Sequence, residues 1–220
     1  MSVKAPLPLR QILAYGGFML LGLGIALVWR AYRAGPEAPL SVTPFEAATV
    51  LDAGPPIAAF ALTDQRGRPF TEANFAGRWT FLYFGYTSCP DACPTTLKVL
   101  GQMGKHLPLA LAAQLRIVFV SVDPKRDTPE KLAKYVDYFG KDMLGVTGDD
   151  VALQALTKPL GIHYERHESD GAAYLVDHSA NVLGVDPEGR LRMLFSPPFD
   201  AAAMAADLVR VAGAKDPGPK

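Results

Sequence analysis

Two nearly uninterrupted runs of apolar, strand-forming residues constrain this 220-residue chain more than any other feature. Residues 79–84 read Trp-Thr-Phe-Leu-Tyr-Phe, and residues 116–122 read Arg-Ile-Val-Phe-Val-Ser-Val. Strands that face water on one side alternate apolar and polar residues, whereas strands buried on both faces do not. The two runs therefore predict central strands of a sheet that other elements cover on both faces.

Helical and turn patterns surround these runs along the chain. Thr128 and Pro129 form a helix-start signal, because threonine caps free N–H groups and proline fits the first turn. Gly140 is expected to end that helix. The predicted helices are 95–106, 129–139, 149–160 and 200–211, and the predicted strand pairs are 60–63 with 69–71 and 173–185 with 191–195. This order of elements predicts a three-layer α/β domain.

The N-terminal part of the chain carries a separate signal. Residues 12–29 are 18 residues without a charged side chain. As a helix they would extend about 27 Å, close to the ~30 Å hydrocarbon thickness of a bilayer. A cleaved signal peptide would have a shorter apolar core and a small-residue cleavage site, whereas this run ends in Trp29-Arg30. We therefore predict one uncleaved transmembrane helix over 12–29, preceded by a short segment, 1–11.

Composition and charge indicate how the rest of the chain is organised. Residues 34–56 contain five prolines and few bulky apolar residues, so residues 30–56 are predicted to be a flexible tether. The folded domain is predicted over 57–212, with a disordered tail over 213–220. The chain has 22 basic and 22 acidic side chains. This balance disfavours a general nucleic-acid binder, because such proteins usually carry a basic excess.

The two cysteines of the chain, Cys89 and Cys93, lie in the loop between the 79–84 run and the first predicted helix. Ligand sites in α/β sheets form at the carboxyl ends of strands, and a helix N-terminus stabilises a thiolate. Residues four apart on a helix have Cβ atoms about 5–6 Å apart, wider than the ~3.8 Å of a relaxed disulfide. The spacing therefore predicts either a readily reduced disulfide or a pair of metal-binding thiolates, and both cysteines are candidates for redox chemistry.

A metal would need further ligands, and the chain has four histidines. His106 suits a helix end, and His163 and His167 lie in a polar stretch that predicts an exposed loop or edge. His178 begins the predicted hairpin and could fold over the cysteine loop, although a structural role is equally open. Two thiolates and one imidazole suit Cu(I) well and Cu(II) tolerably, with Zn(II) as the competing interpretation.

The residues around these positions resemble one known family. Residues 85–95, Gly-Tyr-Thr-Ser-Cys-Pro-Asp-Ala-Cys-Pro-Thr, are similar to the signature of the Sco/SenC family of copper-binding assembly proteins. Residues 121–124, 126–129 and 174–179 also resemble that family. The similarity spans about residues 55–212. A single predicted anchor followed by a tether is also similar to the domain organisation of the family.

The resemblance implies a fold and a site. The fold is thioredoxin-like, a central sheet with flanking helices and an inserted β-hairpin. The site is a copper site formed by Cys89, Cys93 and His178. By analogy, Asp91 influences the cysteine loop, and Asp177 orients or tunes His178.

The resemblance also implies a role and a location. The family's role is maturation of the dinuclear copper centre in cytochrome c oxidase subunit II, so that subunit is the expected partner, together with a periplasmic copper donor. The domain is expected outside the cytoplasm. The short N-terminus lacks a Ser- and Arg-rich transit peptide, which favours a bacterial inner membrane, with residues 1–11 in the cytoplasm and the domain in the periplasm, over the mitochondrial inner membrane.

Three functional hypotheses fit the cysteines. The first is copper delivery by ligand exchange at a three-ligand site. The second is thiol–disulfide reduction of the client's copper-ligand cysteines. The third, a peroxidase or redox sensor, is least favoured because the loop offers no obvious arginine to activate peroxide. Loss of His178 should abolish the first activity and largely spare the second.

Overall fold

The computed structural model describes residues 19, 22–26, 42–52, 54–168 and 173–213. The chain divides into two compact units, residues 1–39 and 40–220. In the first unit, residues 22–26 are helical. Within the described ranges, none of the helices has the length and apolar character needed to cross a membrane. Most of the predicted anchor over 12–29, the segment 1–11, and residues 214–220 of the predicted tail lie outside the described residues.

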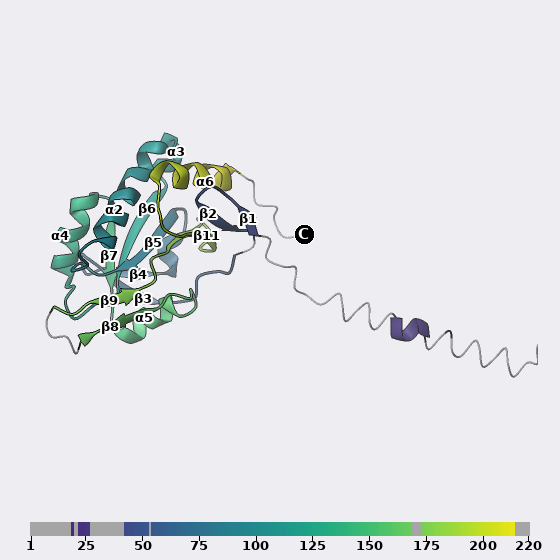
Figure 1. The fold of residues 1–220 in the computed structure, drawn as a ribbon, viewed down its shortest axis with the longest axis horizontal. Coiled ribbons are helices and arrows are strands. Elements are labelled where there is room, and N and C mark those ends of the chain that lie inside the picture. The colour runs from purple at the N-terminus through teal and green to yellow at the C-terminus, as the bar shows by residue number, and fades with distance from the viewer. Residues whose placement is uncertain (1–18, 20–21, 27–41, 53, 169–172, 214–220) are drawn as a thin grey trace, which may run out of the picture. The chain divides into compact units, whose positions relative to one another are not determined.

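The second unit is built on a nine-stranded sheet (Figure 1). In spatial order the strands are β1 (Val42–Pro44), β2 (Ala48–Leu51), β11 (Leu191–Phe195), β10 (Val182–Val185), β5 (Trp79–Gly85), β6 (Leu115–Ser121), β7 (Leu144–Thr147), β3 (Ala61–Asp64) and β4 (Pro69–Thr71). Strand β6 pairs in parallel with both β5 and β7, and the other pairs are antiparallel. The two apolar runs of the sequence are thus the central strands β5 and β6, as predicted.

Helices cover both faces of this sheet. Residues of α2 (Ala92–Met103), α4 (Pro129–Phe139) and α6 (Ala201–Gly213) form one buried cluster with the sheet. Residues of α5 (Asp150–Thr157) and of the short helix η1 (Glu72–Phe75) contribute to a second cluster. Two short elements, η2 (Gly104–His106) and α3 (Leu109–Ala112), follow α2. Mixed α/β layering with parallel central strands is the thioredoxin-like arrangement that was expected.

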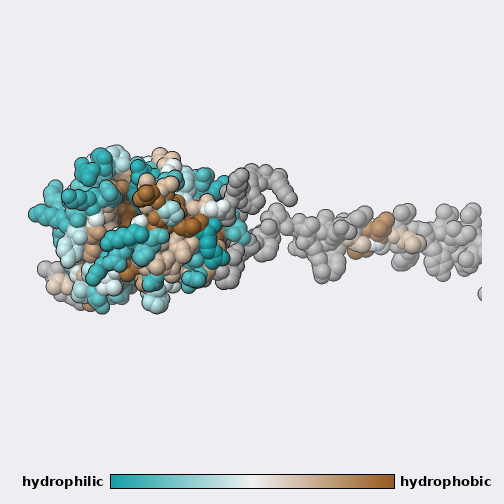
Figure 2. Space-filling model, turned by 90° about the horizontal axis from the view of Figure 1, so that it is seen from above, coloured by the Kyte–Doolittle hydropathy of each residue, from teal (hydrophilic) through white to brown (hydrophobic). Residues whose placement is uncertain are grey.

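Strand β5 shows why its sequence lacks polar alternation. Phe81 and Tyr83 belong to the first cluster, whereas Leu82 and Phe84 belong to the second. Successive side chains of a strand point to opposite faces, so each neighbour enters a different core. All seven residues of β5 are buried. In Figure 2, much of the visible surface of this unit is hydrophilic around smaller hydrophobic areas, as expected when apolar side chains fill two interior clusters.

The predicted tether over 30–56 is wrong at its C-terminal end. Strand β2 pairs antiparallel with β11, and Ala48 and Val50 on it are buried. The carboxylate of Asp207 on α6 accepts hydrogen bonds from the backbone N–H groups of Ala47 and Ala48 at 2.8 and 2.9 Å. The alternation of Ala48 and Val50 is a strand pattern that the surrounding prolines obscured. The folded unit therefore includes residues before 57.

The predicted strand over 173–185 is two separate strands. Strand β9 (Val176–His178) pairs with β8 (Tyr164–Arg166) in a two-stranded sheet, and only then does β10 begin. The hairpin of β10 and β11 forms as expected, but the first part of the predicted strand belongs elsewhere. The backbone N–H of Ser179 still donates to the carbonyl of His163 at 2.9 Å, so this end of the run follows β8, and β10 begins only at Val182. This break leaves His178 at the end of a short strand.

The helix signals match the structure closely. The Thr128 side chain accepts a hydrogen bond from the N–H of Lys131, Pro129 opens α4, and Gly140 follows its last residue. Helix α2 begins at Ala92, three residues earlier than predicted, and this shift places Cys93 in its first turn. Strand β7 was not predicted from the sequence.

Candidate metal centre

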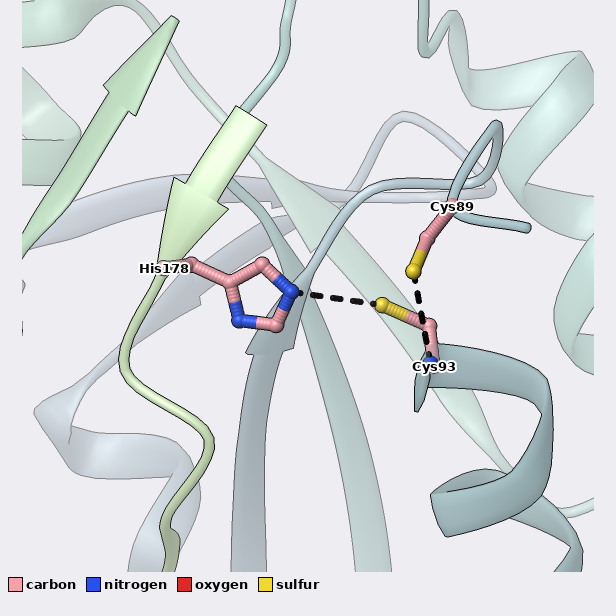
Figure 3. Close-up of side chains that lie close together, drawn as sticks. All are labelled: Cys89, Cys93 and His178. Carbon is pink, nitrogen blue, oxygen red and sulfur yellow. Dashed lines mark hydrogen bonds between the residues drawn. The ribbon is translucent and has the colours of Figure 1, made fainter. Parts of the chain in front are cut away.

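The cysteines lie where β5 passes into α2 (Figure 3). Cys93 is fully buried in the first turn of α2, and Cys89 is half-buried in the loop before it. The backbone N–H of Cys93 donates to Cys89 Sγ at 3.5 Å, which points the first sulfur at the start of the helix. Both thiols are free. The pair thus occupies a helix N-terminus at the carboxyl end of a central strand, as predicted.

Gly85, the last residue of β5, makes room for this arrangement. A Cβ atom at this position would lie 2.5 Å from Cys93 Sγ and 3.0 Å from the Phe119 ring. These separations are shorter than van der Waals contact, so any larger residue would displace the sulfur. The glycine is needed for close approach rather than for an unusual backbone conformation.

His178 reaches the cysteines from the end of β9. Its Nε2 atom lies 3.6 Å from Cys93 Sγ, although 85 positions separate the two residues in the chain. The ligand atoms of Cys89, Cys93 and His178 all lie within 4.8 Å of one another. Figure 3 shows the imidazole and both sulfurs directed toward one point. The structure therefore brings together the three residues that the sequence resemblance had grouped.

A backbone carbonyl fixes the orientation of the imidazole. His178 Nδ1 lies 3.1 Å from the carbonyl oxygen of Ser179. Because a carbonyl can only accept, Nδ1 carries the proton in the neutral ring, and Nε2 presents its lone pair to the sulfurs. The rings of Tyr83 and Tyr86 meet the imidazole edge-on, with centroids 6.1 and 6.2 Å away. These contacts hold the ring so that the unprotonated Nε2 atom can bind a metal.

The two thiols differ strongly in acidity. A hydrogen bond from the Cys93 side chain lowers the pKa of Cys89 to about 5, against the opposing effect of burial. The pKa of Cys93 is raised, first because its proton is held in the hydrogen bond to Cys89 and then because the group is buried. The metal-free pair therefore holds one thiolate and one thiol at neutral pH. Binding a metal through both sulfurs would release the remaining proton.

Tyrosine side chains close the interior side of the centre. The Tyr83 hydroxyl lies 3.9 Å from Cys93 Sγ, and burial raises the pKa of Tyr83, so the group stays protonated. Burial also raises the pKa of Tyr86, which hydrogen-bonds to the backbone of Val176. Sequence reasoning missed both tyrosines. Tyr83 could have been found from strand alternation, since it lies two residues before Gly85 and points to the same face.

The structure gives Asp177 other contacts than the resemblance implied, whereas Asp91 lies at the cysteine loop. The Asp177 carboxylate pairs with His167 Nε2 at 2.8 Å and is largely exposed. It points away from His178, because neighbouring residues on a strand face opposite sides. Asp91 directly precedes α2, its side chain accepts from Thr95 Oγ1 at 3.4 Å, and its backbone helps to lower the pKa of Cys89. Ser179, rather than Asp177, provides the hydrogen bond to His178.

The donor set defines what kind of ion fits. Two soft thiolate sulfurs and one borderline imidazole nitrogen suit Cu(I) and are compatible with Cu(II). A structural zinc site would normally add a fourth protein ligand. Among the described residues, these three are the group of cysteine, histidine or carboxylate side chains close enough to hold an ion. The centre is thus a three-ligand site, one protein ligand short of a closed four-ligand site.

Comparisons with known proteins agree with this geometry. Residues 51–213 match the model of the SCO1/SenC family. A protein of Stutzerimonas stutzeri named "Putative copper-binding protein" is 40% identical over 131 residues, which cover 60% of this chain and 64% of that protein. The bovine protein named "Protein SCO2 homolog, mitochondrial" is 33% identical over 191 residues, which cover 86% of this chain and 70% of that protein.

Solved structures give the same result. The crystal structure of Arabidopsis thaliana ScoI with copper bound matches 71% of this chain and 98% of its own, with 31% identity and a TM-score of 0.67. The fold and the cysteine–histidine centre define a thioredoxin-like protein with a soft-metal site. The chain belongs to the SCO1/SenC family.

Proposed function

We propose that this protein binds copper through Cys89, Cys93 and His178 and delivers it to the dinuclear copper centre of cytochrome c oxidase subunit II. The observation that carries the proposal is the convergence of the three ligand atoms within 4.8 Å of one another. The copper-bound relative and the family match support copper as the ion. The client is the one that the family resemblance implies.

The exposure of the ligands fits release of the ion to another protein. Cys89 is half-buried and His178 is partly exposed, whereas Cys93 is fully buried. A client thiolate can therefore approach from the side of Cys89 and His178 and enter the open coordination position. Exchange then proceeds by replacing one ligand at a time, and the ion stays coordinated throughout.

Anchoring and location form part of the same proposal. The uncharged run over 12–29 would hold the domain at a bacterial inner membrane, with the metal centre in the periplasm. A periplasmic copper donor would load the site, and subunit II would receive the ion. Fractionation of cells, followed by protease treatment of spheroplasts, would check this topology, because only a periplasmic domain is degraded.

A copper titration tests the proposed site. The wild-type chain should bind one Cu(I) or Cu(II), and the Cu(II) form should show a sulfur-to-copper charge-transfer band. Cys89→Ser should weaken that band and lower copper affinity, and His178→Ala should lower affinity while sulfur ligation persists. If both variants bind copper with the wild-type stoichiometry and affinity, the proposed site is wrong.

A second candidate function is reduction of a client disulfide. It is favoured by one observation, the contrast between a half-exposed Cys89 of low pKa and a buried, protonated Cys93. The Cys89 thiolate would attack the client disulfide and form a mixed disulfide, which Cys93 then resolves. The client gains two electrons, and Cys89 and Cys93 become a disulfide. His178→Ala separates the two functions, because it should abolish copper delivery and leave dithiol exchange largely intact.

A further inference from the structure

One loop, residues 122–128 between β6 and α4, contacts two segments of the metal centre. We call the segment that carries Cys89 and Cys93 the cysteine half, and the segment that carries His178 the histidine half. Two carboxylates in this loop are almost fully buried: Asp123 is 0% exposed and Asp127 is 1% exposed. Buried carboxylates are costly unless they are paired and hydrogen-bonded. Neither carboxylate is a ligand in the proposed copper site. Their hydrogen-bond and ion-pair partners therefore show which segments of the chain they hold in place.

Asp127 holds the cysteine half. Its carboxylate accepts from the backbone N–H of Thr87 at 2.8 Å and from the Thr87 hydroxyl. It also accepts from the hydroxyl of Ser121 at 2.6 Å and from Lys131 Nζ at 3.2 Å. Lys131 donates in addition to the Ser88 hydroxyl at 3.1 Å. The loop immediately before Cys89 is thus tied to the end of β6 and to α4.

Asp123 holds the histidine half through two partners. It forms an ion pair with Arg126, and it accepts a hydrogen bond from the Tyr174 hydroxyl. The Arg126 guanidinium lies 3.5 Å from the centroid of the Tyr174 ring, and it donates to the Tyr174 carbonyl at 2.7 Å. Tyr174 precedes β9, the strand that ends at His178. The position of that strand is therefore tied to the same loop.

We propose that Asp127, Asp123 and Arg126 are positioning residues. Together they set the separation between the two sulfurs and the imidazole. The inference rests on the proposed copper site. An ionised carboxylate can accept several hydrogen bonds at once, whereas an amide must present donors on one side. Asp127 therefore suits a point where four donors converge, and asparagine does not.

This arrangement makes the two halves separable by mutation. In Asp127→Asn, the amide NH2 group would face two or more of the donors from Thr87, Ser121 and Lys131. Those donors would lose their acceptor, so the sulfurs should shift. Arg126→Lys keeps the charge but loses the planar fork and the stacking on Tyr174, so the imidazole should shift. Thr87→Val removes one hydroxyl bond to Asp127 and retains the backbone bond, so it is a milder change in the same half.

The test uses the full-length chain loaded with Cu(II). Asp127→Asn should lower copper affinity by about 10- to 100-fold and alter the sulfur-to-copper charge-transfer band, with a smaller change in Thr87→Val. Arg126→Lys should alter the nitrogen hyperfine coupling in the electron paramagnetic resonance spectrum and largely retain the sulfur band. Asp207→Asn is the matched control, because Asp207 is also 1% exposed and accepts backbone N–H groups, but on α6 against β2.

The control should lower the melting temperature and leave both spectra unchanged. The inference is overturned if Asp127→Asn and Arg126→Lys bind copper with the wild-type affinity and spectra. It is equally overturned if their affinity losses match that of Asp207→Asn at the same loss of stability, because the carboxylates would then support only the fold. Failure of the copper site itself would be seen separately, as wild-type binding by Cys89→Ser and His178→Ala.

Discussion

The cysteine half and the histidine half of the metal centre are held in different ways. Cys93 lies in the first turn of a 12-residue helix whose Leu97, Leu100 and Met103 side chains are fully buried. His178 ends a three-residue strand that pairs with another three-residue strand in a separate sheet. An isolated two-stranded sheet is only marginally stable in water. The sulfurs therefore belong to the core of the domain, and the imidazole belongs to an attached arm.

This difference suits the proposed delivery of copper, which requires a preformed site that can also release its ion. The sulfurs are fixed by the same packing that stabilises the whole domain. The arm depends on a few long-range contacts, chiefly those of Tyr174 and Val176 with the second cluster and with the 122–128 loop. In the proposed delivery, the imidazole would therefore be the first ligand to leave, without a change in the main sheet.

Hydrogen exchange gives the largest expected contrast between the halves. Amides of β5 and β6 should exchange only through global unfolding, whereas those of β8 and β9 should exchange through local opening. The protection factors should differ by about 10³-fold, since local openings cost much less than the full stability of a domain. Native-state exchange followed by mass spectrometry measures this directly. Equal protection in both pairs of strands would remove the distinction between core and arm.

Gly85→Ala tests how rigidly the cysteine half is held. The added Cβ atom would lie 2.5 Å from Cys93 Sγ, so the sulfur must move. We expect a loss of copper affinity of about 100-fold and a loss of roughly 1–3 kcal/mol in the free energy of unfolding.

Gly184→Ala in β10 is a suitable control for this change. Its Cβ atom would lie 2.9 Å from Met193 Cβ, away from the ligands. This control should lose comparable stability and retain copper affinity, measured by competition with a chelator. Wild-type affinity in Gly85→Ala would show that the cysteine half can adjust after all.

The thiol pKa values predict a distinctive pH dependence in the metal-free protein. Because the pKa of Cys89 is about 5, its thiolate fraction is nearly constant above pH 6 and falls as the pH decreases through 5. The rate of alkylation by iodoacetamide should follow that fraction and decrease about tenfold per unit below the pKa.

Cys93→Ala tests the cause of this shift, because the hydrogen bond from Cys93 is its largest contribution. In that variant the midpoint of the alkylation profile should move upward, toward the usual value for a thiol. A midpoint that stays near 5 would assign the low pKa to the helix N-terminus instead.

The two halves also differ in how far the sequence predicted them. The cysteine half follows from local rules: the apolar run of β5, a loop with two thiols, and a helix start. The strand and helix boundaries there were off by at most three residues, and the deviation came from counting the helix from Thr95 rather than Ala92. Only the role of Gly85 needed coordinates, because it depends on how closely Cys93 approaches.

The histidine half was not accessible to local rules. A single strand over 173–185 was expected because the apolar residues on either side of 179–181 look continuous. Pairing of β9 with β8 depends on contacts between segments that no short pattern reveals. Placing His178 at the cysteines thus required the family resemblance, and the contacts of Asp123 and Asp127 became visible only in three dimensions. The buried strand β2 was missed for a similar reason, since the flanking prolines suggested a tether.

The smallest expected effect concerns Asp177, which the resemblance had placed beside His178. Its carboxylate is 78% exposed and pairs with His167. Exposed ion pairs contribute about 0–1 kcal/mol to stability, so Asp177→Asn should change the free energy of unfolding by no more than that. Copper affinity should change by less than about twofold, because the hydrogen bond from His178 Nδ1 to Ser179 is untouched. A tenfold loss in a chelator competition would instead mean that Asp177 turns toward the imidazole when copper is bound, and the arm would then have two arrangements.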